Sequence, residues 1–390
     1  MYYAVQYGRP SGNDPTEGMI SKLAKDTSTP ITFEHTSSTN LNDFETTIFG
    51  ARDISSLGDL SCLYPKEVVI PNCIKLVELS VGCRELGPNG ETYYNPNLTT
   101  VSTGNNTLLR TIDVSNCPNL KGDLNLSGCI NIKEVYAKGS GITSISLPTG
   151  GYINKLVLPN TFNNLILKGQ KYLTNAGIEL DDFKSLNQLN IDNCPELDVL
   201  ELLEKCKSGD DYTVQFMRLT NINLGEVTYD FIMNKLAKIG GISAENETYA
   251  PSDTRAAYIE GTCKITNITG KELADIKRIF PYLVVYYDTL TLDITFKDQS
   301  GSDILYGPIS KTFVSGNSSQ GVEVIDPVNQ NLIDKPTKTS TAQYHFEFGG
   351  WSLKPNGDPD ITALRGISAD TTLYVAFNNI LRSYPVSFYV

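Results

Sequence analysis

Apolar residues recur through the middle of the chain in one short frame. Residues 109–120 read L-x-x-I-x-V-x-x-C-x-x-L, and residues 124–132 read L-x-L-x-x-C-x-x-I. The alternating centre of this frame predicts a short β-strand whose apolar side chains point inward while the polar residues between them point outward. The cysteine and the last apolar residue of the frame come after this strand, and they predict a corner where the chain changes direction.

The frame repeats often enough to predict a stack. It returns at 186–197, and the strand centre recurs at positions 112, 124, 135, 145, 156 and 165, in steps of 9 to 12 residues. One such strand cannot bury its apolar face alone, whereas stacked copies share a core in which each Leu or Ile contributes about 1.5 to 3 kcal/mol. Two steps make one coil, so we expect strands on two sides of a flattened solenoid.

After Cys194 the pattern lengthens and acquires helical periods. Residues 195–207 predict a helix and residues 212–219 the next strand. Two further helical patterns cover 227–239 and 271–280, and Gly240-Gly241 and Pro281 supply their stop signals. We therefore expect longer α/β coils from about residue 195, ending in a strand at 283–287.

These segments resemble the leucine-rich-repeat family, whose pattern L-x-x-L-x-L-x-x-N/C-x-L is matched from about Leu57 to Leu202. The resemblance implies a β-rich α/β chain with a leucine-rich-repeat solenoid over residues 51–288 and a capping segment of strand and helix over 1–50. It also implies a habit of binding proteins or glycans.

A second resemblance covers the C-terminal part, where strand patterns occur at 290–297, 321–325, 344–348 and 372–377. The segments LDITF at 292–296, FGGW at 348–351 and ISADTTLYVAF at 367–377 resemble the Listeria-Bacteroides repeat, the internalin B-repeat of bacterial surface proteins. This resemblance implies a small β-grasp-like domain over 289–382. Residues 383–390 echo the first of these strands and predict the start of a further repeat.

Charge and hydropathy exclude two classes of partner. The chain has 32 Lys and Arg against 44 Asp and Glu, and a net charge of -12 repels nucleic acid. No apolar stretch approaches the roughly 20 residues that span a bilayer, and the first residues lack the features of a signal peptide. We expect no nucleic-acid partner and no membrane insertion. If the protein acts outside a cell, it must be part of a larger chain, leave the cell by another export route, or belong to a virus that is released by lysis.

The cysteines predict structure rather than chemistry. Of the eight cysteines in the chain, we assign five to the corner position of the frame, and their spacings match no compact zinc motif. A small thiol packs well at an inward corner and donates weakly to backbone carbonyls. We therefore predict a structural ladder of buried free thiols and no metal site. The ladder residues are Cys73, Cys83, Cys117, Cys129 and Cys194.

Nothing in the sequence predicts a catalytic residue or a cofactor. His35 and His345 are the only histidines, and neither stands in a frame with a nucleophile. The densest carboxylate clusters, Asp181-Asp182 and Asp210-Asp211, flank predicted helices, where acidic residues ordinarily act as caps. The alternative is an enzyme. A surface glycosidase would use a pair of carboxylic acids for catalysis and the solenoid as a platform for its substrate.

The prediction for function is a non-enzymatic structural and recognition protein. The pairing of these two domains resembles that of surface adhesins of bacteria, and similar pairings occur in virion proteins of bacteriophages that infect gut bacteria. Because no signal peptide, LPxTG motif or lipobox is visible, we favour a tail-associated or baseplate-associated bacteriophage protein at the virion surface. The alternative is a secreted bacterial cell-surface adhesin. The expected partners are a protein or a cell-surface glycan, or other virion subunits. Outward residues of the repeat are the candidate contacts: Asp113, Tyr136 and Val157 on one side, and Asn125, Ser146 and Ile166 on the other.

Overall fold

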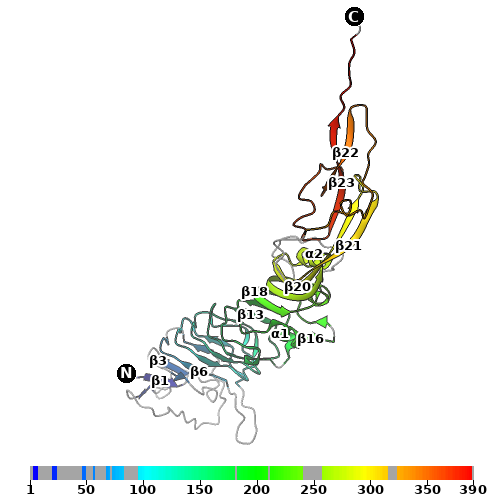
Figure 1. Ribbon diagram of the computed structural model, residues 1–390. Helices are drawn as coiled ribbons and strands as arrows, with labels where there is room; N and C mark the ends of the chain where they lie inside the picture. Colours follow the sequence, from blue (N-terminus) through cyan, green and yellow to red (C-terminus); the bar gives the residue numbers. More distant parts are fainter. Residues whose placement is uncertain are drawn as a thin grey trace. The chain divides into compact units, whose positions relative to one another are not determined.

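The computed structural model describes most of the chain beyond residue 95 and less of what precedes it (Figure 1). The ranges described are 3–7, 20–23, 46–49, 56–57, 67–70, 73–82, 95–180, 182–209, 211–239, 257–314 and 323–388. The predicted ladder residue Cys83 lies outside them. So do His35, Asp181 and Asp210.

Strands dominate the secondary structure. In chain order they are β1 Tyr3–Tyr7, β2 Ile20–Leu23, β3 Thr46–Phe49, β4 Ser56–Leu57, β5 Glu67–Val69, β6 Glu78–Ser80, β7 Thr100–Ser102, β8 Thr111–Asp113, β9 Lys121–Asn125, β10 Glu134–Tyr136, β11 Gly141–Ser146, β12 Lys155–Leu158, β13 Asn164–Lys168, β14 Ile178–Leu180, β15 Gln188–Asp192, β16 Lys207–Ser208, β17 Asp211–Tyr212, β18 Phe216–Glu226, β19 Ala257–Thr269, β20 Leu283–Lys297, β21 Ile304–Val314, β22 Tyr344–Ser352 and β23 Thr371–Leu381. The described helices are α1 Val199–Lys205, the π-helix η6 Phe231–Leu236 and α2 Gly270–Ile279, with short 3-10 turns η4 Asn175–Gly177 and η5 Phe183–Ser185.

The described residues divide into two compact units. Residues up to 224, together with 237–239 and 257–261, belong to the first unit, and residues 225–236 and 262–388 belong to the second. Small sheets in the first unit are the antiparallel sheet of β2, β1 and β3 and the two-stranded pairs β5–β7 and β16–β17. Two large sheets, of six and ten strands, carry most of the remaining strands.

The six-stranded sheet is parallel throughout, in the order β14-β12-β10-β8-β6-β4. One inward residue from each of five strands stands in register with the next: Leu79, Ile112, Val135, Leu156 and Ile178. None of the five is more than 4% exposed. Side chains at alternate positions share one face of a strand, so a column of this kind buries apolar surface continuously along the stack.

The first unit's part of the ten-stranded sheet is also parallel and contains β9, β11, β13, β15 and β18. From β8 to β15 successive strands alternate between the two large sheets. Leu165, Leu189 and Met217 form one inward column here, and all three are buried. The buried faces of both sheets supply the core of the unit.

Left-handed residues turn the chain at several corners. Asn116 and Asn193, with φ of 55° and 51°, each stand directly before a buried cysteine. Asparagine tolerates this backbone region better than most residues because its short amide can bond to the local backbone. The Asn-Cys pairs of the sequence pattern therefore mark places where the backbone needs positive φ.

The second unit is built around the long strand β20, which has one antiparallel and one parallel neighbour among the strands of this unit. β20 pairs antiparallel with β21 and parallel with β23, and β23 pairs antiparallel with β22. Trp351, only 2% exposed, lies edge-on to Phe296 with ring centroids 4.5 Å apart. Thr269 and Glu272 form a reciprocal capping box at the start of α2, as their spacing in the sequence favours.

The predicted fold class, a leucine-rich-repeat solenoid followed by a small β-grasp-like domain, is wrong. The described residues form large parallel and mixed sheets with only three helices apart from the 3-10 turns, and no closed solenoid is present among them. Only the coarser expectation of a β-rich chain fits. The apolar frame specifies which side of each strand is buried, whereas the order and closure of the sheets depend on contacts between distant segments.

Candidate recognition surface

The outward side of the ten-stranded sheet in the first unit presents a regular grid of side chains, which we term the sheet face. Its strands are in register, so that Asn125 lies beside Ser146, and Asn164 beside Gln188. Most members are polar, and many are amides, hydroxyls or carboxylates. The sheet face comprises Asp123, Asn125, Ser144, Ser146, Asn164, Ile166, Lys168, Gln188, Asn190, Asp192, Phe216, Arg218 and Thr220.

Asp123 organises one end of the sheet face. Its carboxylate accepts hydrogen bonds from the Ser144 hydroxyl at 2.9 Å and from the Ser146 hydroxyl at 2.7 Å. Hydrogen bonds to a charged acceptor are stronger than neutral ones and hold both hydroxyls in a defined orientation. The remaining acceptor positions on these hydroxyl oxygens are therefore fixed in space before any ligand arrives.

Asp192 organises the other end in the same way. Its carboxylate accepts from the Asn221 amide and from the Thr220 hydroxyl, each at 2.8 Å. These two bonds favour the ionised form, and they lower the pKa of Asp192 below its ordinary value. The carboxylate is thus a permanent, oriented acceptor on the sheet face.

Apolar and aromatic groups interrupt this polar grid. Ile166 is 36% exposed and Phe216 is 51% exposed. The Arg218 guanidinium lies 4.3 Å from the centroid of the Tyr258 ring, within the range of a cation–π contact. Oriented polar groups beside exposed rings are the combination that protein and glycan recognition both use.

The structure brings the two predicted sets of contact residues into two different sheets. Asp113, Tyr136 and Val157 stand in register on β8, β10 and β12, whereas Asn125 and Ser146 are paired on β9 and β11. Asp113 is 2% exposed and Val157 9%, while the partly buried Tyr136 donates its hydroxyl to Glu134 at 3.0 Å. The first set is therefore largely covered, and the sheet face holds Asn125, Ser146 and Ile166.

The described cysteines are all free and buried. Cys117 donates to the Ser115 carbonyl at 3.4 Å, Cys129 contacts the Thr103 hydroxyl at 3.3 Å, and Cys194 donates to the Asp192 carbonyl at 3.5 Å. Burial raises the pKa of Cys117 to about 12 and raises those of Cys73, Cys129 and Cys194 in the same direction. The thiols of these corners are packed as neutral groups.

Native-state labelling should report this burial. At pH 8 we expect alkylation of Cys117, Cys206 and Cys263, whose pKa values burial raises to about 12, to be at least roughly a hundredfold slower than in urea. Because the folded state disfavours the thiolate, the free energy of unfolding should fall as pH rises from about 9 toward 12. Peptide mass spectrometry of alkylated protein measures the rates. Equal labelling with and without urea would contradict the burial of these thiols.

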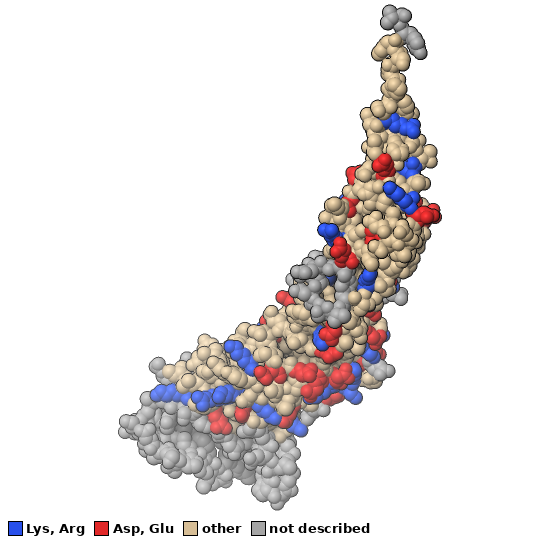
Figure 2. All heavy atoms as spheres, in the orientation of Figure 1, with Lys and Arg blue, Asp and Glu red and all other residues tan. Residues whose placement is uncertain are grey.

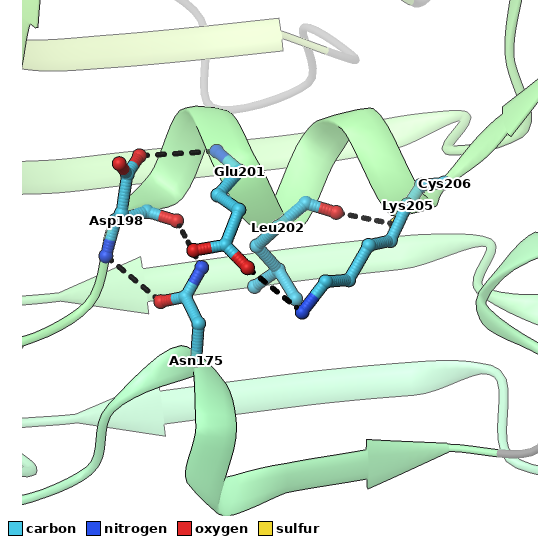
Figure 3. A network of polar contacts seen from close by, with 6 residues as sticks. All are labelled: Asn175, Asp198, Glu201, Leu202, Lys205 and Cys206. Atoms are coloured by element: carbon cyan, nitrogen blue, oxygen red, sulfur yellow. Dashed lines mark hydrogen bonds and ion pairs between the residues drawn. The ribbon is translucent and has the colours of Figure 1, made fainter.

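A buried amide joins the turn η4, which precedes β14, to the start of α1 (Figure 3). The Asn175 side chain donates to the Asp198 carbonyl at 2.7 Å and accepts from the Asp198 N–H at 2.9 Å. Asp198 caps α1 by accepting from the Glu201 N–H at 3.0 Å, and Glu201 pairs with Lys205 at 3.0 Å. Cys206 donates to the Leu202 carbonyl at 3.3 Å. One amide thus sets the start of the helix.

The acidic clusters show mixed outcomes. Asp182 caps η5 by accepting from the Lys184 N–H at 2.9 Å, which confirms the capping prediction there. Asp211 instead lies in β17, so that prediction is wrong at this residue.

Within the described ranges, no group of three or more His, Cys, Asp or Glu side chains could hold a metal ion. No described helix is long and apolar enough to cross a membrane.

Sequence reasoning missed several residues of the sheet face. Asp123 stands two positions before Asn125, and Phe216 and Arg218 flank a buried methionine on β18. Extending the alternation by one residue in each direction along every strand would have found them.

No family model matches the chain, and no curated protein matches it.

Proposed function

We propose that this chain is a non-enzymatic recognition protein whose sheet face binds a protein or a cell-surface glycan. The observation that carries the proposal is the ordered grid itself. Asp123 and Asp192 hold neighbouring hydroxyl and amide groups in place, and exposed Ile166 and Phe216 stand among them. A surface that is organised before binding loses less entropy when a ligand arrives.

The charges of the sheet face support binding over hydrolysis. A glycosidase needs a carboxylic acid with a raised pKa to protonate the leaving group. At Asp192 the pKa is lowered, because Asn221 and Thr220 donate to the carboxylate. The carboxylate of Asp123 is likewise engaged by two hydroxyls. Both groups suit accepting hydrogen bonds from a ligand.

The proposed location is the surface of a bacteriophage virion, in the tail or baseplate, where other virion subunits are further partners. A secreted bacterial adhesin is the alternative. The resemblance of residues 292–296, 348–351 and 367–377 to repeats of bacterial surface proteins supports a surface-exposed role in either setting. Mass spectrometry of purified phage particles and of bacterial cell-wall fractions distinguishes the two. Absence of the chain from both preparations would overturn the proposed location.

Removal of the exposed apolar groups tests the sheet face. We expect the double substitution Ile166→Ser and Phe216→Ser to weaken binding at least roughly tenfold on a printed glycan array and on immobilised bacterial surface proteins. Each side chain buries roughly half or more of its apolar surface, so the unfolding free energy should fall by about 1 kcal/mol per site, which leaves the fold intact. Tyr286→Ser, at a residue 53% exposed in the second unit, is the matched control. Binding unchanged by the double substitution would rule out the sheet face.

A further inference from the structure

One row of the sheet face crosses its strands β9, β11, β13, β15 and β18 in turn. Each strand contributes one outward residue, and each residue stands in register with its neighbour on the next strand. We term this line the cross-strand row. Neighbouring strands are about 4.8 Å apart, so the row presents a side chain at that interval over roughly 19 Å. Its members are Asp123, Ser144, Asn164, Gln188 and Phe216.

Two side-chain amides at the centre of the cross-strand row have no hydrogen-bond partner within the described part of the chain. They belong to Asn164 and Gln188, which are partly buried and directly opposite each other. An amide group carries two N–H donors and an acceptor oxygen. The hydroxyl of Ser144, on the next strand, is held by the Asp123 carboxylate at 2.9 Å. The row therefore offers donors and acceptors on adjacent strands to a ligand with hydroxyl groups.

Charges on the sheet face balance one another. Its charged members are Asp123, Lys168, Asp192 and Arg218. The pKa of Asp192 is lowered chiefly by the hydrogen bonds that its carboxylate accepts, and the charges of Lys168 and Arg218 lower it further. Both signs of charge also occur over the first unit on the side that Figure 2 shows. A neutral ligand is complementary to such a face, whereas a polyanion or a polycation is not.

The composition of the cross-strand row favours a glycan over a protein. The centre of a protein interface is apolar and closely packed, whereas the centre of this row is a pair of amides. Its one large apolar side chain is Phe216, which is 51% exposed and stands at the β18 end. A sugar ring has an apolar C–H face that can stack on an aromatic ring, and its hydroxyls exchange hydrogen bonds with amides.

We propose that the cross-strand row binds a neutral, unbranched glycan that lies across the strands. One sugar unit lies over each strand, and the unit at the β18 end stacks on Phe216. An extended chain of pyranose units advances by about one strand spacing per sugar, so successive units meet successive members of the row. Hydroxyls of the middle units bond to the amides of Asn164 and Gln188. The inference rests on the proposed function of the sheet face and names its ligand class.

Glycan charge and length provide the first test. On a printed array we expect the full chain to bind unbranched neutral glycans, and to bind sulfated or uronic-acid glycans of equal length no more tightly. For the neutral glycan that binds best, calorimetric titration with oligomers of increasing length should show affinity rising up to about five units, one for each strand of the row. High salt should change this affinity less than roughly twofold. A preference for charged glycans, or an affinity independent of length, would overturn the proposal.

Removal of the two central amides tests the row itself. We expect Asn164→Ala with Gln188→Ala to weaken binding of the neutral glycan at least roughly tenfold, because each variant amide no longer bonds to a sugar hydroxyl. Phe216→Tyr should keep the affinity, since the ring remains. Asn154→Ala with Asn160→Ala, at exposed residues outside the sheet face, is the matched control. Thermal unfolding checks that each variant is folded. Unchanged glycan affinity in the folded Asn164 and Gln188 variant would exclude the row.

A protein ligand separates this inference from the proposed function. The full chain could bind bacterial surface proteins, lose that binding in the Ile166→Ser and Phe216→Ser variant, and bind no neutral glycan. That result would overturn the glycan row while it supports the sheet face as a recognition surface. Binding to neither class of ligand would overturn both.

Discussion

Replacing Trp351 by alanine is expected to lower the free energy of unfolding of the second unit by about 3 to 5 kcal/mol. The indole is 2% exposed and lies edge-on to Phe296 and Phe348, with centroids 4.5 and 5.7 Å away. Its ring N–H also donates to the Asp326 carboxylate at 3.0 Å. Alanine would leave a cavity between these rings and remove the hydrogen bond that ties residue 326 to β22.

Urea titration followed by circular dichroism measures this loss in the variant. Trp351 is the only tryptophan of the chain, so its fluorescence independently follows the same unfolding step in the unmodified protein. Trp351→Phe is the matched control, because it keeps an aromatic ring and removes the N–H donor. We expect a clearly smaller loss for phenylalanine. Equal losses for the two substitutions would show that the hydrogen bond, and not the packing, carries the effect.

Replacing Asn175 by alanine is expected to cost about 2 to 4 kcal/mol in the first unit. Asn175 is 7% exposed, and its amide satisfies both the N–H and the carbonyl of Asp198. A buried backbone group left without a partner costs about 1 to 3 kcal/mol. Because Asp198 caps α1, the loss should also loosen the first turn of that helix.

Hydrogen exchange of the α1 amides and urea unfolding measure the two consequences of Asn175→Ala. Asn119→Ala is the matched control, since the exposed Asn119 makes one bond of the same kind, to the Pro96 carbonyl at 2.6 Å. We expect that control to cost less than about 1 kcal/mol. Faster exchange in α1 for both variants, or for neither, would be inconsistent with a specific role of Asn175.

Most of the short strands and helices could be predicted from the amino-acid sequence. The frames centred on residues 112, 135 and 156 predict strands, and β8, β10 and β12 confirm them. The helical pattern over 271–280 corresponds to α2, and the one over 195–207 contains the shorter α1. Over 227–239 the structure has a helical segment at 229–236, most of it the π-helix η6, so the helix predicted there is confirmed over part of its length. Strand β21 was not predicted, because its alternation is interrupted by Gly307-Pro308.

The candidate surfaces were predicted less completely. Alternation in the strands pointed to Asn125, Ser146 and Ile166, which the sheet face contains. It could not show that Asp113 and Val157 are covered, since burial on an outward side depends on what packs against it. Tyr152 and Tyr172 lie in turns of unequal length, so no fixed spacing in the sequence brings them together.

By itself, the sequence determined which residues form short strands, which side chains of those strands are buried, and where the chain turns at Asn116 and Asn193. These features depend on contacts within a few residues and on the preference of apolar groups to leave water. Only the tertiary structure decided that the strands form open parallel and mixed sheets, and that the rings of Tyr152 and Tyr172, from two different turns, stack on each other. Strand order and the alignment of turns arise from pairings across tens of residues, and a local pattern carries no information about them.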